Sequence, residues 1–169
     1  VKAQFEKTSA DVLVHCAGCA DVGKSIKDPQ KDFEGNTKAV HNLLFALKEL
    51  GQTQMKILVI SSAAVYGNPS ELPIQEEAQL RPVSPYALHK EMAEHICEYF
   101  IQNYGFDNKI LRIFSAYGPG LRKQIFWDMY QKMQKDGKLP MFGTGMESRD
   151  YIYIDDICQA FQLIIERSP

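Results

Sequence analysis

Lys56-Ile57-Leu58-Val59-Ile60-Ser61 is the stretch that decides the fold. Its apolar residues are continuous and partly β-branched, which is typical of a parallel strand that helices cover on both faces. Val12-Leu13-Val14, inside an expected strand at 11–15, has the same character, and a further strand is expected at 109–114. The sequence therefore predicts a sheet built from parallel strands.

Amphipathic segments alternate with these strands, at residues 33–50, 85–104 and 124–135. In the first of them, four leucines recur at helical spacing and Gly51 follows as a C-terminal cap. The order is strand and helix in repetition. This order predicts an α/β fold with a Rossmann-type, doubly wound parallel sheet.

The composition is that of one compact, globular chain, with 45% hydrophobic content in 169 residues. The net charge of -2 comes from interspersed acidic and basic residues, so we expect no nucleic-acid partner. No apolar run reaches the roughly 18 residues that cross a bilayer, and no signal-peptide pattern is found. We therefore expect a cytoplasmic protein without a membrane partner.

The cysteines are too sparse for a disulfide scaffold, and we interpret all four as free thiols in a reducing compartment. Cys16 and Cys19 lie beside His15, but a zinc site needs further ligands and no second cluster appears. We expect no metal site.

Three histidines on expected helices, His41, His89 and His95, have polar neighbours and are interpreted as solvated. Asp155 and Asp156 follow an expected strand at 151–154, where carboxylates commonly cap the next helix.

Tyr86 and Lys90 stand four positions apart near the start of an expected helix, so their side chains lie on one face. A phenol with a pKa near 10 is a poor base at neutral pH, and a neighbouring ammonium lowers that pKa. Ser61 and Ser62 stand where an apolar strand ends, the edge at which open α/β sheets bind ligands. Either feature alone also fits an ordinary helix surface or turn.

Together, the order of strand, serines, loop and Tyr-x-x-x-Lys resembles the extended short-chain dehydrogenase/reductases, especially the NAD-dependent epimerase/dehydratase family and its UDP-galactose 4-epimerases. The segments Val14-His15-Cys16-Ala17-Gly18, Tyr117-Gly118-Pro119-Gly120 and Arg149-Asp150-Tyr151-Ile152 carry the resemblance further. It implies that Tyr86 is the acid/base, Lys90 its partner at the nicotinamide ribose, Ser62 the contact to the reacting hydroxyl and Asn36 a residue that steadies the site. The cofactor implied is NAD, with NADP left open. The resemblance implies a cofactor site formed by Ala17, Gly18, Asn36, Ser61, Tyr86, Lys90 and Ile113, and a substrate site formed by Ser62, Tyr86, Ser115, Gln124, Met141, Phe142 and Arg149.

The chain also departs from the family's pattern. Ser115 replaces a common asparagine, Ala20 stands in place of a cofactor-binding lysine, and the glycine-rich phosphate turn of the first βα unit is not found. We therefore expect an incomplete part of a longer enzyme. Residues 1–118 would form a partial NAD(P)-binding Rossmann domain with the catalytic residues, and residues 119–169 the start of a small nucleotide-sugar-binding lobe.

The preferred hypothesis is that the protein is an isomerase, a nucleotide-sugar 4-epimerase. It would oxidise C4 of its substrate, expected to be a UDP-linked sugar, and then reduce that carbon again. The family's dehydratases carry an acidic pair just after the strand-end hydroxyl, where this chain has Ala63 and Ala64. A dehydratase or a reductase stays open as an alternative, and so does a non-catalytic nucleotide-sugar sensor. The apolar stripe of the 85–104 helix is wider than one sheet requires, so we expect a homodimer through helices 34–50 and 85–104.

Overall fold

The computed structural model describes residues 2–7, 10–139 and 143–167. Contacts between residues divide the chain into two compact units, Val1–Ile113 and Phe114–Pro169, and each is described here by itself. The division falls a few residues before Gly118, where the sequence predicted a change of segment.

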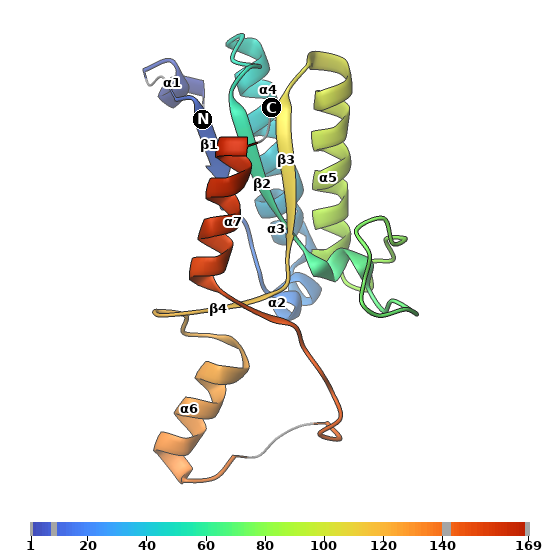
Figure 1. Ribbon diagram of the computed structural model, residues 1–169, viewed down its shortest axis with the longest axis vertical. Coiled ribbons are helices and arrows are strands. Elements are labelled where there is room, and N and C mark those ends of the chain that lie inside the picture. The colour runs from blue at the N-terminus through green and yellow to red at the C-terminus, as the bar shows by residue number, and fades with distance from the viewer. Residues whose placement is uncertain (1, 8–9, 140–142, 168–169) are drawn as a thin grey trace. The chain divides into compact units, whose positions relative to one another are not determined.

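The first unit is built on a three-stranded sheet in which all strands run parallel (Figure 1). Its strands are β1 (Val12–His15), β2 (Lys56–Ser62) and β3 (Asp107–Ile113), in the spatial order β1-β2-β3. Ile57, Leu58 and Val59 in the central strand are almost fully buried, as a continuous apolar run requires. The predicted parallel strands are confirmed, with β3 beginning slightly earlier than expected.

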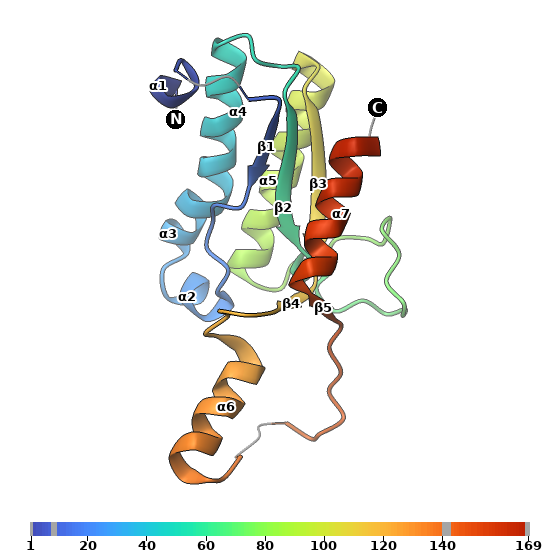
Figure 2. The same cartoon turned by 60° about the vertical axis from the view of Figure 1, so that its left-hand side comes forward.

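Two long helices, α4 (Ala39–Glu49) and α5 (Pro85–Tyr104), lie side by side along the same three strands (Figures 1 and 2). Leu44 and Leu47 of α4 and Cys97 and Phe100 of α5 meet Ile57 of β2 in the main hydrophobic core. Full burial of a leucine, isoleucine or phenylalanine side chain contributes about 1.5–3 kcal/mol to the stability of the fold. A short helix, α1 (Lys2–Phe5), contacts α4.

The expected helix at 33–50 is not one regular helix. It begins as α3 (Pro29–Phe33), passes through a π-helical turn (Glu34–Lys38) and continues as α4. The preceding helix, α2 (Val22–Lys27), is capped by Asp21, and α3 is capped by Asp28, each through its carboxylate and a backbone N–H. The π turn contains Asn36, one of the candidate site residues. Such turns are frequent at functional sites.

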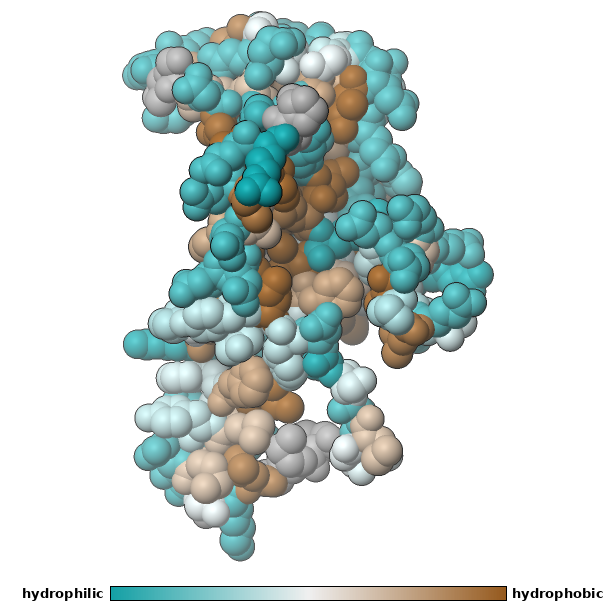
Figure 3. Space-filling model, viewed as in Figure 1, coloured by the Kyte–Doolittle hydropathy of each residue, from teal (hydrophilic) through white to brown (hydrophobic). Residues whose placement is uncertain are grey.

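A short 3₁₀ helix (Ala63–Tyr66) follows β2 and leads into the loop 67–83. Gly67 has a φ of 65°, and a Cβ at this position would overlap the carbonyl oxygen of Arg81. The Arg81 backbone N–H donates to the Val65 carbonyl at 3.0 Å, so the base of the loop is closed. The loop projects from the unit and its surface is mainly hydrophilic (Figure 3).

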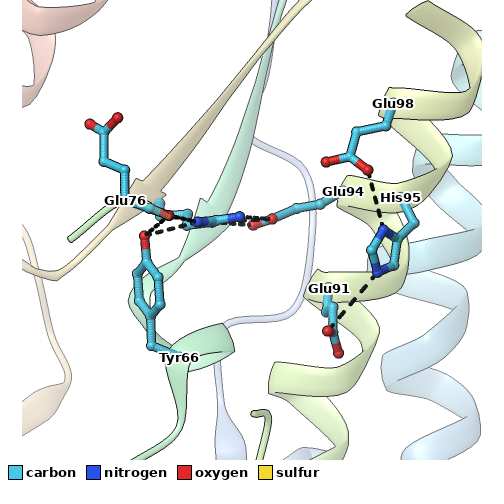
Figure 4. Close-up of polar contacts among 7 residues, drawn as sticks. Tyr66, Glu76, Glu91, Glu94, His95 and Glu98 are labelled. Atoms are coloured by element: carbon cyan, nitrogen blue, oxygen red, sulfur yellow. Dashed lines mark hydrogen bonds and ion pairs between the residues drawn. The ribbon is translucent and has the colours of Figure 1, made fainter. Parts of the chain in front are cut away.

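Arg112 of β3 joins this loop to the rest of the unit through Glu94, Tyr66 and Glu76, all three of which are labelled in Figure 4. Its Nη2 donates to Glu94 of α5 at 2.7 Å, and its Nε donates to both oxygens of that carboxylate. Its Nη1 donates to the Tyr66 hydroxyl and to the Glu76 carbonyl oxygen, each at 2.8 Å. Hydrogen bonds to Glu94 raise the pKa of Arg112, which is therefore a permanent cation. Three segments, α5, the 3₁₀ helix and the loop, therefore contact the guanidinium that β3 contributes.

The second unit contains the parallel pair β4 (Ser115–Tyr117) and β5 (Tyr151–Tyr153), and the helices α6 (Gln124–Asp136) and α7 (Ile154–Arg167). The expectation that Asp155 and Asp156 cap the last helix needs correction. The helix begins at Ile154, so both carboxylates lie inside its first turn, where they interact favourably with the helix dipole.

Within the described ranges, no helix is long and apolar enough to cross a membrane. The same ranges contain no group of three or more potential metal-ligating side chains, and all four cysteines are free thiols.

Candidate functional site

The carboxyl ends of the three parallel strands gather the first unit's candidate residues at one edge of the sheet. Ser62 ends β2 and is paired in register with Ile113, the last residue of β3. Ala17 and Gly18 follow the end of β1 and are exposed. The structure therefore brings together residues that the sequence separates by almost a hundred positions.

Tyr86 and Ser62 lie together at this edge. Tyr86 is the second residue of α5, whose N-terminus is capped by the Ser84 hydroxyl with Pro85 at the first helical position. The Tyr86 phenol is hydrogen-bonded to the Ser62 hydroxyl. The Ser62 oxygen also accepts from the Ala64 backbone N–H at 3.2 Å, which fixes its orientation.

Burial raises the pKa of Tyr86, while the hydrogen bond from Ser62 lowers it and the charge of Asp32 raises it. The net direction is upward, opposite to the expected effect of Lys90. The physical reason is that the phenol is only 8% exposed, and loss of water penalises its ionised form. In the protein alone, Tyr86 is therefore a protonated phenol at neutral pH.

Lys90 extends from α5 to the central strand, where its Nζ donates to the Ile60 carbonyl oxygen at 2.9 Å. Burial lowers the pKa of Lys90, and the charges of Asp32, Cys19 and Glu94 partly oppose that change. A Cβ built on Gly18 would lie 3.5 Å from this Nζ, so the backbone after β1 passes close to the ammonium. The contact that excludes a side chain at Gly18 is a different one, because a Cβ there would overlap Asn36 Oδ1.

Asn36 also lies beside this backbone segment, since a Cβ built on Gly18 would lie 2.7 Å from its Oδ1. Its Nδ2 donates to the Cys19 carbonyl oxygen at 3.1 Å, and its buried Oδ1 has no hydrogen-bond partner among the described residues. The buried Ser61 hydroxyl also has no partner there. Buried polar atoms are normally paired, so these two unpaired atoms, of which that of Asn36 is close to Gly18, fit a polar ligand. These residues fit a dinucleotide cofactor.

Four residues outside the predicted site form hydrogen bonds at the start of α5 and hold it in place. Ser25 accepts from the Tyr86 backbone N–H at 3.1 Å, and Thr37 donates to the His89 carbonyl oxygen at 2.9 Å. His89 itself is hydrogen-bonded to Asp32 at 2.7 Å, and both side chains are buried. The prediction that His89 is solvated is therefore wrong, because its partner comes from a separate helix far back in the sequence. His41 and His95 are on the surface, as expected.

The remaining candidate substrate residues belong to the second unit. The Ser115 backbone N–H donates to the Asp150 carbonyl oxygen at 3.1 Å, so Ser115 lies beside the segment that contains Arg149. Arg149 is exposed. Gln124 opens α6 with a φ of 68°, a backbone region that side chains rarely adopt. Met141 and Phe142 lie outside the described residues.

Comparison with known proteins finds two similar 4-epimerases. The chain is 31% identical over 161 residues to the UDP-glucuronate 4-epimerase of Thermodesulfobacterium geofontis, covering 94% of this chain and 49% of that protein. The crystal structure of the UDP-glucuronic acid 4-epimerase of Bacillus cereus, in complex with UDP-glucuronic acid and NAD, superposes with a TM-score of 0.90. It is 30% identical, and the match covers 99% of this chain and 52% of that one.

A dehydratase is almost as similar. The dTDP-glucose 4,6-dehydratase of Streptomyces venezuelae, crystallised as a double mutant with NAD bound, has a TM-score of 0.88 and 25% identity. The match covers 97% of this chain and 50% of that one. The chain thus spans about half the length of the relatives it matches.

A parallel Rossmann-type sheet with a serine, a tyrosine and a lysine at its carboxyl edge defines a class of nicotinamide-dependent enzymes acting on hydroxyl and carbonyl groups. Within that class, the model of the NAD dependent epimerase/dehydratase family matches residues 1–169. The chain belongs to this family.

Proposed function

We propose that the intact protein is an NAD-dependent nucleotide-sugar 4-epimerase, an isomerase whose acid/base residue is Tyr86. The observation that carries the proposal is the cluster of Ser62, Tyr86 and Lys90 at one sheet edge, beside the orphaned polar atoms of Asn36 and Ser61. The UDP-sugar and NAD complexes of the similar epimerase support the substrate class and the cofactor.

The residues of this chain would act on a hydroxyl of the sugar. Ser62 accepts or donates a hydrogen bond at that hydroxyl and passes its proton toward Tyr86, to which it is already bonded. Lys90, fixed by the Ile60 carbonyl, supplies a positive charge that favours the tyrosinate once the site is assembled. The chemistry that bound NAD would supply is transfer of hydride from the sugar carbon and back to it. Gly18, Asn36 and Ser61 would position the cofactor.

The 3₁₀ helix after β2 favours an epimerase over a dehydratase. Elimination of water from an oxidised sugar needs an acid and a base close to the strand-end hydroxyl. The two residues after Ser62 are Ala63 and Ala64, which have no ionisable group. A reductase with the same cofactor site remains the alternative, because it needs no second acid.

The product decides between these reactions. The intact protein is incubated with NAD and, in separate samples, UDP-glucose, UDP-N-acetylglucosamine and UDP-glucuronic acid, and the products are followed by NMR. We expect the C4 epimer of one of them. A deoxy keto sugar would assign a dehydratase, and a net reduction that consumes NADH would assign a reductase. A sensor would bind the nucleotide sugar and leave it unchanged.

We also propose a homodimer through α4 and α5. Phe45 and Tyr99 on these helices are 47% and 53% exposed, large values for aromatic side chains. With neighbouring residues they line a surface cavity of about 410 Å³. Apolar patches of this kind on helix pairs commonly mark contacts between proteins. The cytoplasmic location stays a prediction from the sequence.

A further inference from the structure

The buried pair of Asp32 and His89 has no role in the mechanism above. Asp32 comes from α3 and His89 from α5, and their exposed fractions are 3% and 9%. A carboxylate oxygen only accepts, so the His89 Nδ1 donates to Asp32 Oδ2, at 2.7 Å. The Phe33 ring packs edge-on against the imidazole, with 5.5 Å between ring centroids. This hydrogen bond is therefore short and shielded from water.

The location of His89 connects the pair to the reactive residues. His89 follows Tyr86 by three positions and directly precedes Lys90, so it belongs to the same first turns of α5. Two other elements contact this part of the helix, through Ser25 at the Tyr86 N–H and Thr37 at the His89 carbonyl. Among these contacts, the bond to Asp32 is the one formed between two ionisable side chains.

The charge of Asp32 reaches both reactive groups. The Oδ1 atom of Asp32 is buried and has no hydrogen-bond partner among the described residues. His89, bonded to Oδ2, is therefore the one hydrogen-bond donor that those residues provide to this carboxylate. The charge of Asp32 raises the pKa of Lys90, and so do the charges of Cys19, in the loop after β1, and Glu94 of α5. The charge of Lys90 lowers the pKa of His15 of β1, and the charge of Asp32 raises the pKa of Tyr86, which favours the protonated phenol.

We infer that Asp32 and His89 are positioning residues for Tyr86 and Lys90: their hydrogen bond fixes the first turns of α5 on α3, and the carboxylate keeps a negative charge beside the buried ammonium. The inference deepens the proposed function and rests on it for its kinetic consequence. Burying a carboxylate costs free energy, and a neutral pair of the same shape would secure the helix equally well. The charge is the feature that a merely structural contact would not require.

The test uses the intact protein with the substitutions Asp32→Asn, His89→Leu and His89→Asn. Asp32→Asn removes the charge and retains the shape, His89→Leu removes the donor, and His89→Asn retains a donor near the position of Nδ1. We expect Asp32→Asn and His89→Leu to lower kcat at least about tenfold, with KM for the nucleotide sugar changed less than about twofold. His89→Asn is expected to restore most of the rate.

The matched control is His95→Leu on the same helix. The His95 side chain is 64% exposed. Its ion-pair partners are Glu91 and Glu98 on the same helix, as Figure 4 shows. This variant should retain both kinetic constants. Circular dichroism verifies that each variant is folded, and if His89→Leu is not, Asp32→Asn decides.

A second readout does not depend on turnover. The Lys90 ammonium is titrated by NMR of lysine side chains, with Lys90→Met to assign its signal, and we expect Asp32→Asn to shift its titration to lower pH. If the wild type is inactive but this shift is found, the proposed reaction fails and the placement of the charge stands. If the wild type is active and Asp32→Asn changes neither kcat nor the Lys90 titration, the inference is overturned.

Discussion

Arg112→Met is a substitution whose effect on stability follows directly from the structure. The Glu94 carboxylate is 2% exposed and the Arg112 side chain 24% exposed, so the pair is largely removed from water. Without the guanidinium, Glu94 remains as a buried charge without its counterion, and the Tyr66 hydroxyl and Glu76 carbonyl lose a donor. Breaking such a pair from one side costs about 3–5 kcal/mol of unfolding free energy.

The double variant Arg112→Met/Glu94→Gln separates the charge from the packing. It removes the buried carboxylate as well, so we expect it to be more stable than Arg112→Met by at least about 2 kcal/mol. The control is Lys109→Met on the same strand. Lys109 pairs with Asp107 at 3.1 Å but is 41% exposed, and such surface pairs contribute less than about 1 kcal/mol.

Urea unfolding followed by circular dichroism measures all three variants against the wild type. The reasoning is refuted if Arg112→Met costs no more than Lys109→Met. It is equally refuted if the double variant is less stable than the single one, because the loss would then come from packing and not from the unpaired charge.

Three further outcomes are expected. Leu44→Ala, at a fully buried position of α4, should lower the unfolding free energy by about 2–5 kcal/mol in urea titrations, and a loss below about 1 kcal/mol would contradict the assigned core. Burial raises the pKa of Cys97 from 9.0 to about 12, so the unfolded chain releases this proton first and stability falls as the pH rises above 9. From pH 9 to pH 10 the wild type should lose about 1 kcal/mol more than Cys97→Ala, and parallel stability curves would exclude this effect. Tyr99→Asp places a charge on the proposed dimer surface and should shift sedimentation toward the monomer, whereas an unchanged profile would place the contact elsewhere.

The sequence predicted the sheet and α5 well because their signals are local. The continuous apolar run of β2 allows few alternatives, and Ser84, Pro85 and Gly105 mark both ends of α5. The π turn was not predictable, since one additional residue in a helical turn leaves the spacing of apolar residues almost unchanged.

The supporting residues of the site were missed for a different reason. A histidine and an aspartate in polar surroundings are usually exposed, and the bond between His89 and Asp32 joins positions 57 residues apart. Only the tertiary fold reveals such a partner. Tyr86, Lys90 and Ser62 could be proposed from the sequence because their order along the chain is itself a pattern. The sequence did not reveal that the pKa of Tyr86 is raised, because burial, its main cause, is a property of the folded protein.

The rate of C4 epimerisation by the Tyr86→Phe variant of the intact protein tests the central claim most directly. The substitution removes one hydroxyl from a buried ring and should leave the affinities for NAD and the nucleotide sugar nearly unchanged. Loss of a general acid/base lowers turnover by about 10²–10⁴-fold, and we expect a loss in this range. A variant that binds both ligands and still turns over within about tenfold of the wild type would contradict the assignment of Tyr86.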